Sequence, residues 1–589
     1  MYSISSFLLS QKHKKLTQEN TSKEEYSMNT ITIKQGESPA YSLDRGYVAK
    51  VDTKKCVNCG TCRENCPVEA IDEAQRWICR VCPECTNQPG MRLHDIDAFR
   101  TKQSCTTACP LGISPQGYIG LARNGKDEAA FKIIWEKNPL PSVCAHICHH
   151  PCEQVCKRGV LVDEPMAIRG IKRYLDENVE YTRPKYPRLY DERIAVIGAG
   201  PAGLSAGHFL SELGYEVDIY EANNEPGGML VRAIPDFRLS HEEDRKDIRK
   251  LTEAGLSIHC SAPLGKKQIA ELQKEYDAIV VAAGTPHGKE ITWVPKWNYD
   301  AVYTAIQFMD FANNDQDTVR MPHQNFEIVG KEGIVIGGGS VAMDTARTAL
   351  RLGAKKVTVI CLESGEDVPA HKWEKDEAIE EGIVFLEGYS PKAYTGRVNT
   401  LEGIDFAKVT KFEKDENGKI HFETNDEDIL HIPTNFCIVA IGQYADPIFP
   451  EADGETVFWA GDIAGGACSV IDALASGRDA AFDVDAAIQE RMLRNGRISH
   501  KLVPGPLEEK LYPCNRRKTR HHERPMQPAA DRVKNFDDVE ITYTAKQVYQ
   551  EELRCLGCGY AMIDAEKCIG CGVCQKLCPE GDVITMVRK

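Results

Sequence analysis

Cysteines are the residues of this chain whose number and spacing point most directly to chemistry. Of the 24 cysteines in 589 residues, 13 lie between Cys56 and Cys156 and six between Cys555 and Cys578. A chain of this length does not need disulfides to build a core. Its polar start lacks the apolar stretch and the cleavage site of a secretory signal, so we expect a cytoplasmic protein. Clustered cysteines in that reducing compartment indicate metal or cluster ligands.

The first four cysteines have the spacing of bacterial ferredoxins, Cys56-x2-Cys59-x2-Cys62-x3-Cys66 followed by Pro67. This run is typical of a [4Fe–4S] cluster, because a tight turn aims three thiolates at one face of the cube. The proline directs the fourth thiolate away, usually to a neighbouring cluster. Zinc is the alternative, but zinc sites use two separated pairs and do not place proline after a fourth cysteine.

Further cysteines are predicted to bind more clusters. Nine follow the first run, around a stretch with helical periodicity at 117–137: Cys79, Cys82, Cys85, Cys105, Cys109, Cys144, Cys148, Cys152 and Cys156. A second ferredoxin run, with two cysteines before it, lies near the other end: Cys555, Cys558, Cys568, Cys571, Cys574 and Cys578. We expect four clusters, and a fifth only if a ligand other than cysteine completes it. The assignment of thiols to clusters stays open.

A glycine motif between two predicted strands indicates a dinucleotide site. A buried-strand pattern at 193–197 runs into a helix through Gly198, Gly200, Pro201, Ala202 and Gly203, and a strand at 215–220 ends at Glu221. In the Rossmann fingerprint the glycines allow close approach to the pyrophosphate, and the acid binds the ribose.

The same unit recurs 139 residues later and predicts a second dinucleotide site. Its motif precedes a helix to Leu352 and a strand at 356–360, and contains Gly337, Gly339, Ser340, Val341 and Ala342. Two such sites in one chain suggest a flavin and a nicotinamide placed face to face.

Two shorter segments favour the flavin. A glycine turn contains Gly228, Met229 and Leu230, and Gly461-Asp462 leads into a predicted helix at 469–488. The N-terminus of that helix can face an anionic part of a flavin.

Composition limits the class of partner. The chain is 42% hydrophobic and 27% charged, an ordinary globular composition, and its net charge is −15. An acidic surface argues against nucleic-acid binding. No run of 18 apolar residues is present, so no membrane span is expected.

Together these motifs resemble one family over about two-thirds of the chain. Residues from about 105 to 490 are similar to the small (beta) subunit of glutamate synthase and its relatives, which include the N-terminal half of dihydropyrimidine dehydrogenase and the large subunit of NADH-dependent ferredoxin:NADP oxidoreductase. The matching segments are Cys105-Thr-Thr-Ala-Cys109-Pro-Leu-Gly-Ile, Asn138-Pro-Leu-Pro, Pro151-Cys-Glu-Gln-Val-Cys156, Gly227-Gly-Met-Leu, Ile234-Pro-Asp-Phe-Arg238-Leu, Ala440-Ile-Gly-Gln and Ala460-Gly-Asp-Ile. The resemblance implies FAD at the first glycine motif, with Arg238 among its binding residues, NAD(P)H at the second, and [4Fe–4S] clusters that relay electrons.

Two departures from this family pattern matter. NADPH-using relatives carry an arginine pair after the second strand of the nicotinamide unit, where this chain reads Cys361-Leu362-Glu363. An acid there accepts a hydrogen bond from a free 2′-hydroxyl and repels a 2′-phosphate, so we predict that NADH is preferred over NADPH. Relatives that reduce disulfides need a redox-active cysteine pair, whereas the core cysteines here are isolated in sequence.

The resulting hypothesis is an FAD- and [4Fe–4S]-containing NAD(P)H oxidoreductase subunit. It exchanges hydride with a nicotinamide nucleotide and single electrons with ferredoxin, or with iron–sulfur or flavin subunits of a hetero-oligomeric complex, which is either electron-bifurcating or a single-path electron gate. The alternatives are a glutamate synthase small subunit and a cluster-bearing scaffold without activity. No general acid or base is predicted, since hydride transfer to flavin requires none.

The expected fold is an α/β core of two Rossmann-like domains, preceded by a helical iron–sulfur domain, with small α+β ferredoxin-like modules at both termini. We therefore expect a cluster relay at each end of the flavin. The expected boundaries are a disordered tail at 1–45, a ferredoxin-like module at 46–90, the helical domain at 91–185, the FAD-binding domain at 190–325 and 446–490, the NAD(P)H-binding domain at 326–445, a linker at 491–545 and a second ferredoxin-like module at 546–589. The basic linker is interpreted as solvated, or else as a docking segment for an acidic partner.

Overall fold

The computed structural model describes residues 47–75, 105–294, 299–313, 328–415, 420–488, 519 and 521–588, apart from residues 54, 398, 566 and 569. The expected N-terminal tail, the three cysteines Cys79, Cys82 and Cys85, and most of the basic linker lie outside them. No helix in the described segments is long and apolar enough to cross a membrane.

A parallel five-stranded sheet carries the first glycine motif. Its strand order is β17-β6-β3-β4-β5, and the strands span Arg193–Ile197 (β3), Glu216–Tyr220 (β4), Ser257–His259 (β5), Ala278–Val281 (β6) and Val457–Trp459 (β17). The helices around it are Pro201–Leu213 (α9), Met229–Arg232 (α10), His241–Ala254 (α11), Lys266–Glu275 (α12), Asp462–Gly465 (α16) and Val470–Ile488 (α17). Apolar residues fill both faces of the central strands, as expected for a buried parallel sheet.

A second parallel sheet carries the second glycine motif. Its order is β11-β10-β9-β15-β8, with strands Val302–Thr304 (β8), Glu332–Ile336 (β9), Lys356–Cys361 (β10), Val384–Glu387 (β11) and Phe436–Val439 (β15). Its helices are Ala305–Asn313 (α13), Ser340–Arg351 (α14) and Lys372–Glu380 (α15). An antiparallel sheet of Tyr389–Arg397 (β12), Thr400–Lys414 (β13) and Ile420–Pro433 (β14) extends from it, and the short pair His287–Gly288 (β7) and Gln443–Tyr444 (β16) joins the two α/β halves.

The segment before the first glycine motif is helical, as predicted. Its helices are Pro115–Arg123 (α3), Asp127–Trp135 (α4), Pro141–Ile147 (α5), Pro151–Gln154 (α6), Lys157–Leu161 (α7) and Ile168–Asn178 (α8). The stretch expected to be one helix at 117–137 is instead two, because Gly125 adopts a left-handed φ of 71° that ends the first helix. This turn lets α4 fold back against α3.

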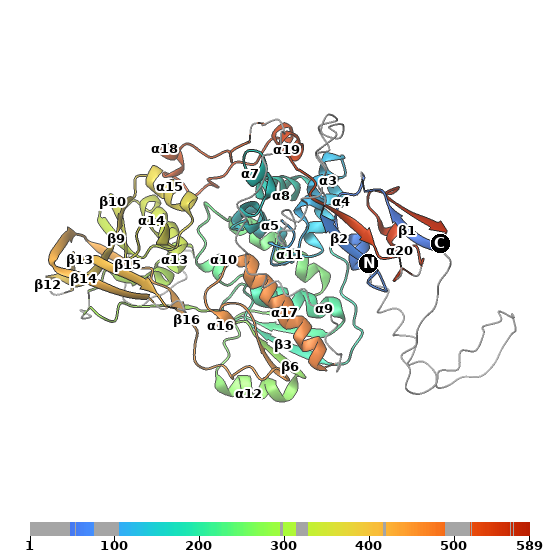
Figure 1. Cartoon of the computed structure of the whole chain (residues 1–589). Coiled ribbons are helices and arrows are strands. Elements are labelled where there is room, and N and C mark those ends of the chain that lie inside the picture. The colour runs from blue at the N-terminus through green and yellow to red at the C-terminus, as the bar shows by residue number, and fades with distance from the viewer. Residues whose placement is uncertain are drawn as a thin grey trace.

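The two ends of the chain form one ferredoxin-like domain and not two separate modules. Strand Tyr47–Val51 (β1) pairs antiparallel with Ile584–Arg588 (β19), and Ile71–Gln75 (β2) pairs antiparallel with Gly559–Ile563 (β18). Helices Thr61–Glu64 (α2) and Val573–Leu577 (α20) pack together, and residues of both ends share one small core. In Figure 1 the blue N-terminal elements lie beside the red C-terminal ones, on the far side of the helical domain from α14 and α15. The expectation of a relay at each end of the flavin is therefore wrong.

The described part of the linker, 521–544, is packed against the protein. It contains Ala529–Arg532 (α18) and leads into Ala545–Glu552 (α19). Figure 1 shows this segment crossing from α15 to the helical domain around α8. Arg532 is only 2% exposed. The interpretation as a solvated linker is wrong for these residues, because Arg532 forms a buried ion pair with Glu381 at the end of α15, and Glu540 forms one with Arg169 on α8.

Candidate functional site

The first glycine motif forms a tight turn between β3 and α9. Gly198 has a φ of 103°, and a Cβ at this position would lie 2.5 Å from the Ala282 carbonyl oxygen of the adjacent strand connection. Pro201 is the first residue of α9, where its missing N–H costs no helical bond. The N-terminus of α9 has no side-chain cap, so its backbone N–H groups are suited to an anionic pyrophosphate.

Three segments that are distant in sequence meet at this turn. A Cβ on Gly228 would lie 2.9 Å from the Cα of Gly200, and a Cβ on Gly461 would lie 2.7 Å from the Cβ of Ala202. The turn of Gly228, the start of α16 and the start of α9 therefore meet at one site with closely spaced backbones. Met229 and Leu230 begin α10 directly after it, and Asp462 accepts hydrogen bonds from the Thr285 hydroxyl (3.4 Å) and the Cys468 amide (3.1 Å).

Glu221 lies at the end of β4, beside this turn. The side chain is buried. One oxygen of its carboxylate accepts a hydrogen bond from the Ala199 amide at 2.8 Å, and the other accepts from the Asn223 amide at 2.9 Å. The carboxylate fixes the glycine turn and stands where a ribose hydroxyl is bound in this type of fold. The uncapped start of α9 and the Glu221 carboxylate fit an adenine dinucleotide such as FAD.

The second glycine motif has the same geometry between β9 and α14. Gly337 has a φ of 141°, and a Cβ there would lie 2.2 Å from the Ala440 carbonyl oxygen. The space around Gly339, at the uncapped start of α14, is open. Ser340 donates a hydrogen bond to Glu374 at 2.5 Å, Val341 is exposed and Ala342 is buried. This motif is suited to a second dinucleotide.

Glu363 lies beside that motif, as its place after β10 predicts. Its carboxylate oxygen would be 3.2 Å from a Cβ on Gly338, and the side chain is only 7% exposed. Burial raises the pKa of Glu363 above its usual value, and the nearby Lys414 opposes that rise. The acid therefore faces the part of the turn where the adenosine ribose of a nicotinamide nucleotide binds.

Two sets of four cysteines line separate pockets of the ferredoxin-like domain. We call them site A and site B. The cysteines that line site A are Cys56, Cys59, Cys62 and Cys578. The cysteines that line site B are Cys66, Cys568, Cys571 and Cys574. Each ferredoxin run thus supplies three thiols to one pocket and its fourth, proline-linked thiol to the other, which is the pattern of two-cluster ferredoxins.

Two more sets lie in and beside the helical domain. In site C, Cys105 interacts electrostatically with Cys156 and with two thiols from near the C-terminus, Cys555 and Cys558. Site D contains the remaining four predicted ligands of this region: Cys109, Cys144, Cys148 and Cys152. The described residues thus place sixteen of the nineteen predicted cluster cysteines in four sets of four.

The chemistry of these thiols fits cluster ligands. Burial raises the pKa of the Cys59 thiol to about 11 and that of Cys144 to about 12, so a bound cation is needed to hold them as thiolates. Backbone amides point at several sulfurs. The Ala561 amide reaches Cys56 Sγ from the opposite end of the chain, at 3.3 Å. Within the described part of the chain, no three His, Cys, Asp or Glu side chains converge on a single metal-ion position.

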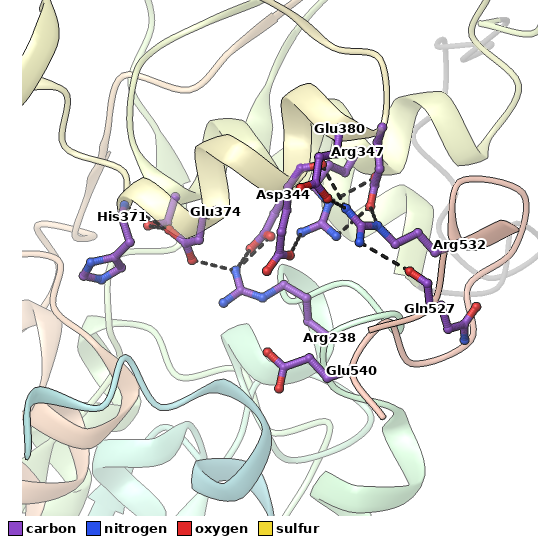
Figure 2. A network of polar contacts seen from close by, with 12 residues as sticks. Arg238, Asp344, Arg347, His371, Glu374, Glu380, Gln527, Arg532 and Glu540 are labelled. Carbon is purple, nitrogen blue, oxygen red and sulfur yellow. Dashed lines mark hydrogen bonds and ion pairs between the residues drawn. The ribbon is translucent and has the colours of Figure 1, made fainter. Parts of the chain in front are cut away.

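Arg238 lies at the contact between the two α/β halves. Its guanidinium pairs with Asp344 at 2.8 Å and with Glu374 at 3.1 Å, both in the half that carries the second glycine motif (Figure 2). A neighbouring network places Glu381 between Arg347, Arg351 and Arg532, at 2.7, 2.6 and 2.9 Å. Sequence reasoning missed this network, because its members are spread from residue 347 to residue 532 and only tertiary packing brings them together.

Comparison with known proteins agrees with this geometry. Residues 192–465 match the family model of pyridine nucleotide-disulphide oxidoreductases. Residues 98–183 match the model of dihydropyrimidine dehydrogenase domain II, which is described as binding a 4Fe-4S cluster. Residues 49–72 and 559–580 each match a 4Fe-4S binding domain.

The chain is similar to subunits of several oxidoreductases. It is 31% identical to the NADP(+)-dependent formate dehydrogenase subunit beta of Moorella thermoacetica, over 77% of this chain and 70% of that protein. It is 30% identical to the NAD-dependent dihydropyrimidine dehydrogenase subunit PreT of Escherichia coli O157:H7, over 70% of this chain and 93% of that protein. It is 26% identical to the glutamate synthase [NADPH] small chain of Azospirillum brasilense, over 65% of this chain and 86% of that protein.

Proposed function

The chain belongs to the family of FAD- and iron–sulfur-containing NAD(P)H oxidoreductases, and we propose that it takes hydride from NADH and passes single electrons, through four [4Fe–4S] clusters, to ferredoxin or to another subunit of its enzyme. FAD and the clusters supply the redox chemistry when bound. The observation that carries the proposal is the presence of two dinucleotide turns and four sets of four cysteines in one chain.

The chain's own residues bind and position the cofactors. The uncapped N-termini of α9 and α14 offer backbone N–H groups to two pyrophosphates, and Glu221 and Glu363 face the two riboses. Arg238 ties the nicotinamide-binding half to the flavin-binding half by pairing with Asp344. A fixed contact of this kind favours a constant distance between donor and acceptor, on which hydride transfer depends.

NADH is proposed as the nucleotide because of Glu363. Its buried carboxylate beside Gly338 accepts a hydrogen bond from a free 2′-hydroxyl and repels a 2′-phosphate. The names of the relatives do not decide between NADH and NADPH, since the formate dehydrogenase subunit is named as NADP(+)-dependent and the dihydropyrimidine dehydrogenase subunit as NAD-dependent. The side chain at position 363 is the specific observation in this chain.

The ferredoxin-like domain favours a larger electron-transfer assembly, either electron-bifurcating between NAD(P) and ferredoxin or linked to a hydrogenase or a formate dehydrogenase. A glutamate synthase small subunit is the second candidate, because such a chain matches 65% of this one. Co-purification with a large synthase subunit would favour that candidate. A neighbouring gene for a hydrogenase, a formate dehydrogenase or an NADH-binding FMN subunit would favour the first.

Anaerobic titration tests the proposal. The purified, cluster-loaded protein is titrated with NADH and, separately, with NADPH, and the flavin absorbance is recorded after each addition. We expect rapid bleaching by NADH and slow or incomplete bleaching by NADPH. A preference for NADPH would overturn the role given to Glu363 and leave the electron relay standing. Bleaching by neither nucleotide would contradict hydride transfer and favour a scaffold role.

A further inference from the structure

Lys172 is a buried cation placed among the thiols of site D. It lies on α8, which packs against α5, the helix that carries Cys144 and ends at Cys148. Its side chain is almost fully enclosed, with 7% of the residue exposed. All four cysteines of site D interact electrostatically with it: Cys109, Cys144, Cys148 and Cys152.

The described residues give Lys172 no carboxylate partner, although its neighbours on α8 have one. Arg169 pairs with Glu540 at 2.5 Å, and Arg173 pairs with Asp538 at 2.6 Å. Asp176, one turn after Lys172, is already paired with Lys246 at 3.2 Å and accepts a hydrogen bond from Ser142 at 2.8 Å. Among the residues that the structure describes, the thiols of site D are therefore the groups left to balance the charge of Lys172.

A buried ammonium without a counter-charge is strongly destabilising. A [4Fe–4S] cluster held by four cysteine thiolates carries a net negative charge, and its one-electron reduction adds one more. We propose that Lys172 is the charge partner of the cluster in site D and raises its reduction potential relative to that of the same cluster without the lysine. Lys172 is a positioning residue, because it acts through the cluster and not on a substrate.

This role follows from the chemistry of reduction. The ammonium interacts more favourably with the reduced, more negative cluster than with the oxidised one, so it stabilises the state that has accepted an electron. Hydrogen bonds and nearby charges are the protein's usual means of setting such potentials. Site D thereby becomes a better electron acceptor. The inference rests on the proposed function only in that the cluster serves as a relay.

The test compares neutral and charged replacements in the full-length, cluster-loaded protein. Lys172→Met and Lys172→Gln remove the charge while keeping much of the volume, and Lys172→Arg retains it. Lys250→Met is the matched control, because Lys250 is a partly buried lysine that donates to the Tyr181 carbonyl at 2.7 Å, and its electrostatic partners are Tyr181 and Glu180. The readouts are iron content per chain and the midpoint potential of each cluster, followed by EPR in a mediated redox titration.

We expect the neutral variants to shift the one-electron equilibrium of one cluster at least tenfold towards its oxidised form, which is about 59 mV for a one-electron couple. The Lys172→Arg and Lys250→Met variants should stay near the wild type. If the neutral variants lose one cluster outright, the inference predicts that Lys172→Arg retains it.

Two results would overturn the inference. One is that Lys172→Met keeps the iron content of the wild type and changes the one-electron equilibrium constant of each cluster by less than about twofold. The other is an equal effect of Lys172→Arg and Lys172→Met, which would mean that shape and not charge matters. The cluster potentials are measured with chemical reductants and do not depend on NADH. If NADH failed to bleach the wild-type flavin, that result would contradict the proposed function but not the role of Lys172.

Discussion

At the scale of single residues, the glycine turns and their acids carry the nucleotide chemistry. Glu363 is the residue on which the proposed preference for NADH rests, because its buried carboxylate lies beside Gly338. A hydrogen bond from a ribose hydroxyl to a charged acceptor contributes about 1.5–3 kcal/mol. A discrimination of more than tenfold between NADH and NADPH can thus come from this one side chain.

Replacing Glu363 with arginine should reverse that discrimination. The guanidinium would bind a 2′-phosphate and offer no acceptor to a 2′-hydroxyl, so we expect the ratio of kcat/KM for NADH over NADPH to fall at least tenfold. The check is steady-state reduction of an artificial acceptor with each nucleotide. Glu366→Arg, an exposed site three residues on, should leave the ratio almost unchanged. An unchanged ratio in Glu363→Arg would contradict the assigned role.

Single residues also show where sequence reasoning works and where it stops. The glycines and Glu363 could be predicted because a turn and the strand before it are local and fix their own geometry. Lys172 could not, since a lysine on a helix with basic neighbours is usually solvated. Only the packing of α8 on α5 encloses it among thiols.

At the scale of elements, helix α19 attaches the C-terminal ligands of site C to the helical domain. It packs against α3 and α8 and leads directly to Cys555. Its last residue, Glu552, is buried, and burial together with the nearby Asp127 raises the pKa of Glu552 to about 8. The folded protein thus holds this carboxyl protonated at neutral pH, whereas the unfolded chain ionises it near pH 4.3.

The stability of this attachment should therefore depend on pH. The folded state binds one more proton than the unfolded state between about pH 4.3 and 8, so the free energy of unfolding falls as the pH rises through that window. Glu552→Gln removes this dependence. We expect the excess of its Tm over that of the wild type to be small at pH 5 and to grow to roughly 3 °C at pH 8. Glu128→Gln, an exposed site on α4, is the control. If Glu552→Gln and the wild type melted at the same temperature at pH 8 as well as at pH 5, Glu552 would be ionised in the folded protein and the prediction would be contradicted.

Element boundaries were predicted well where a periodic pattern ends at glycine or proline. Strands β3 and β10 lie within about one residue of the expected ranges, and α14 ends one residue before the expected Leu352. The split between α3 and α4 was missed, because the apolar periodicity continues across Gly125 and was given more weight than the turn signal of Asn124-Gly125.

At the scale of the whole molecule, the ferredoxin-like domain joins residues more than 500 positions apart, as the pairing of Tyr47 with Arg588 shows. Each cysteine run was recognisable by its spacing, but their union was not, since spacing carries no information on which distant strand will pair. The sheet pairing determines that Cys578 lines site A and Cys66 lines site B.

This exchange of ligands predicts which variants share a phenotype. Cys56→Ser and Cys578→Ser should perturb the same EPR signal, although they lie at opposite ends of the chain. Cys66→Ser and Cys571→Ser should perturb a second, different signal. If Cys66→Ser instead matched Cys56→Ser, each run would hold its own cluster and the exchange would be refuted. Iron content per chain, measured alongside, separates a lost cluster from an altered one.

The union of the two ends also sets the order of events in the cell. Sites A, B and C all include cysteines beyond residue 554, so a ribosome must make almost the whole chain before any of the three can be completed. Until then Cys56, Cys59, Cys62 and Cys66 lack the C-terminal cysteines with which they share sites A and B. Site D, whose ligands end at Cys152, is the described site whose set of thiols is synthesised first.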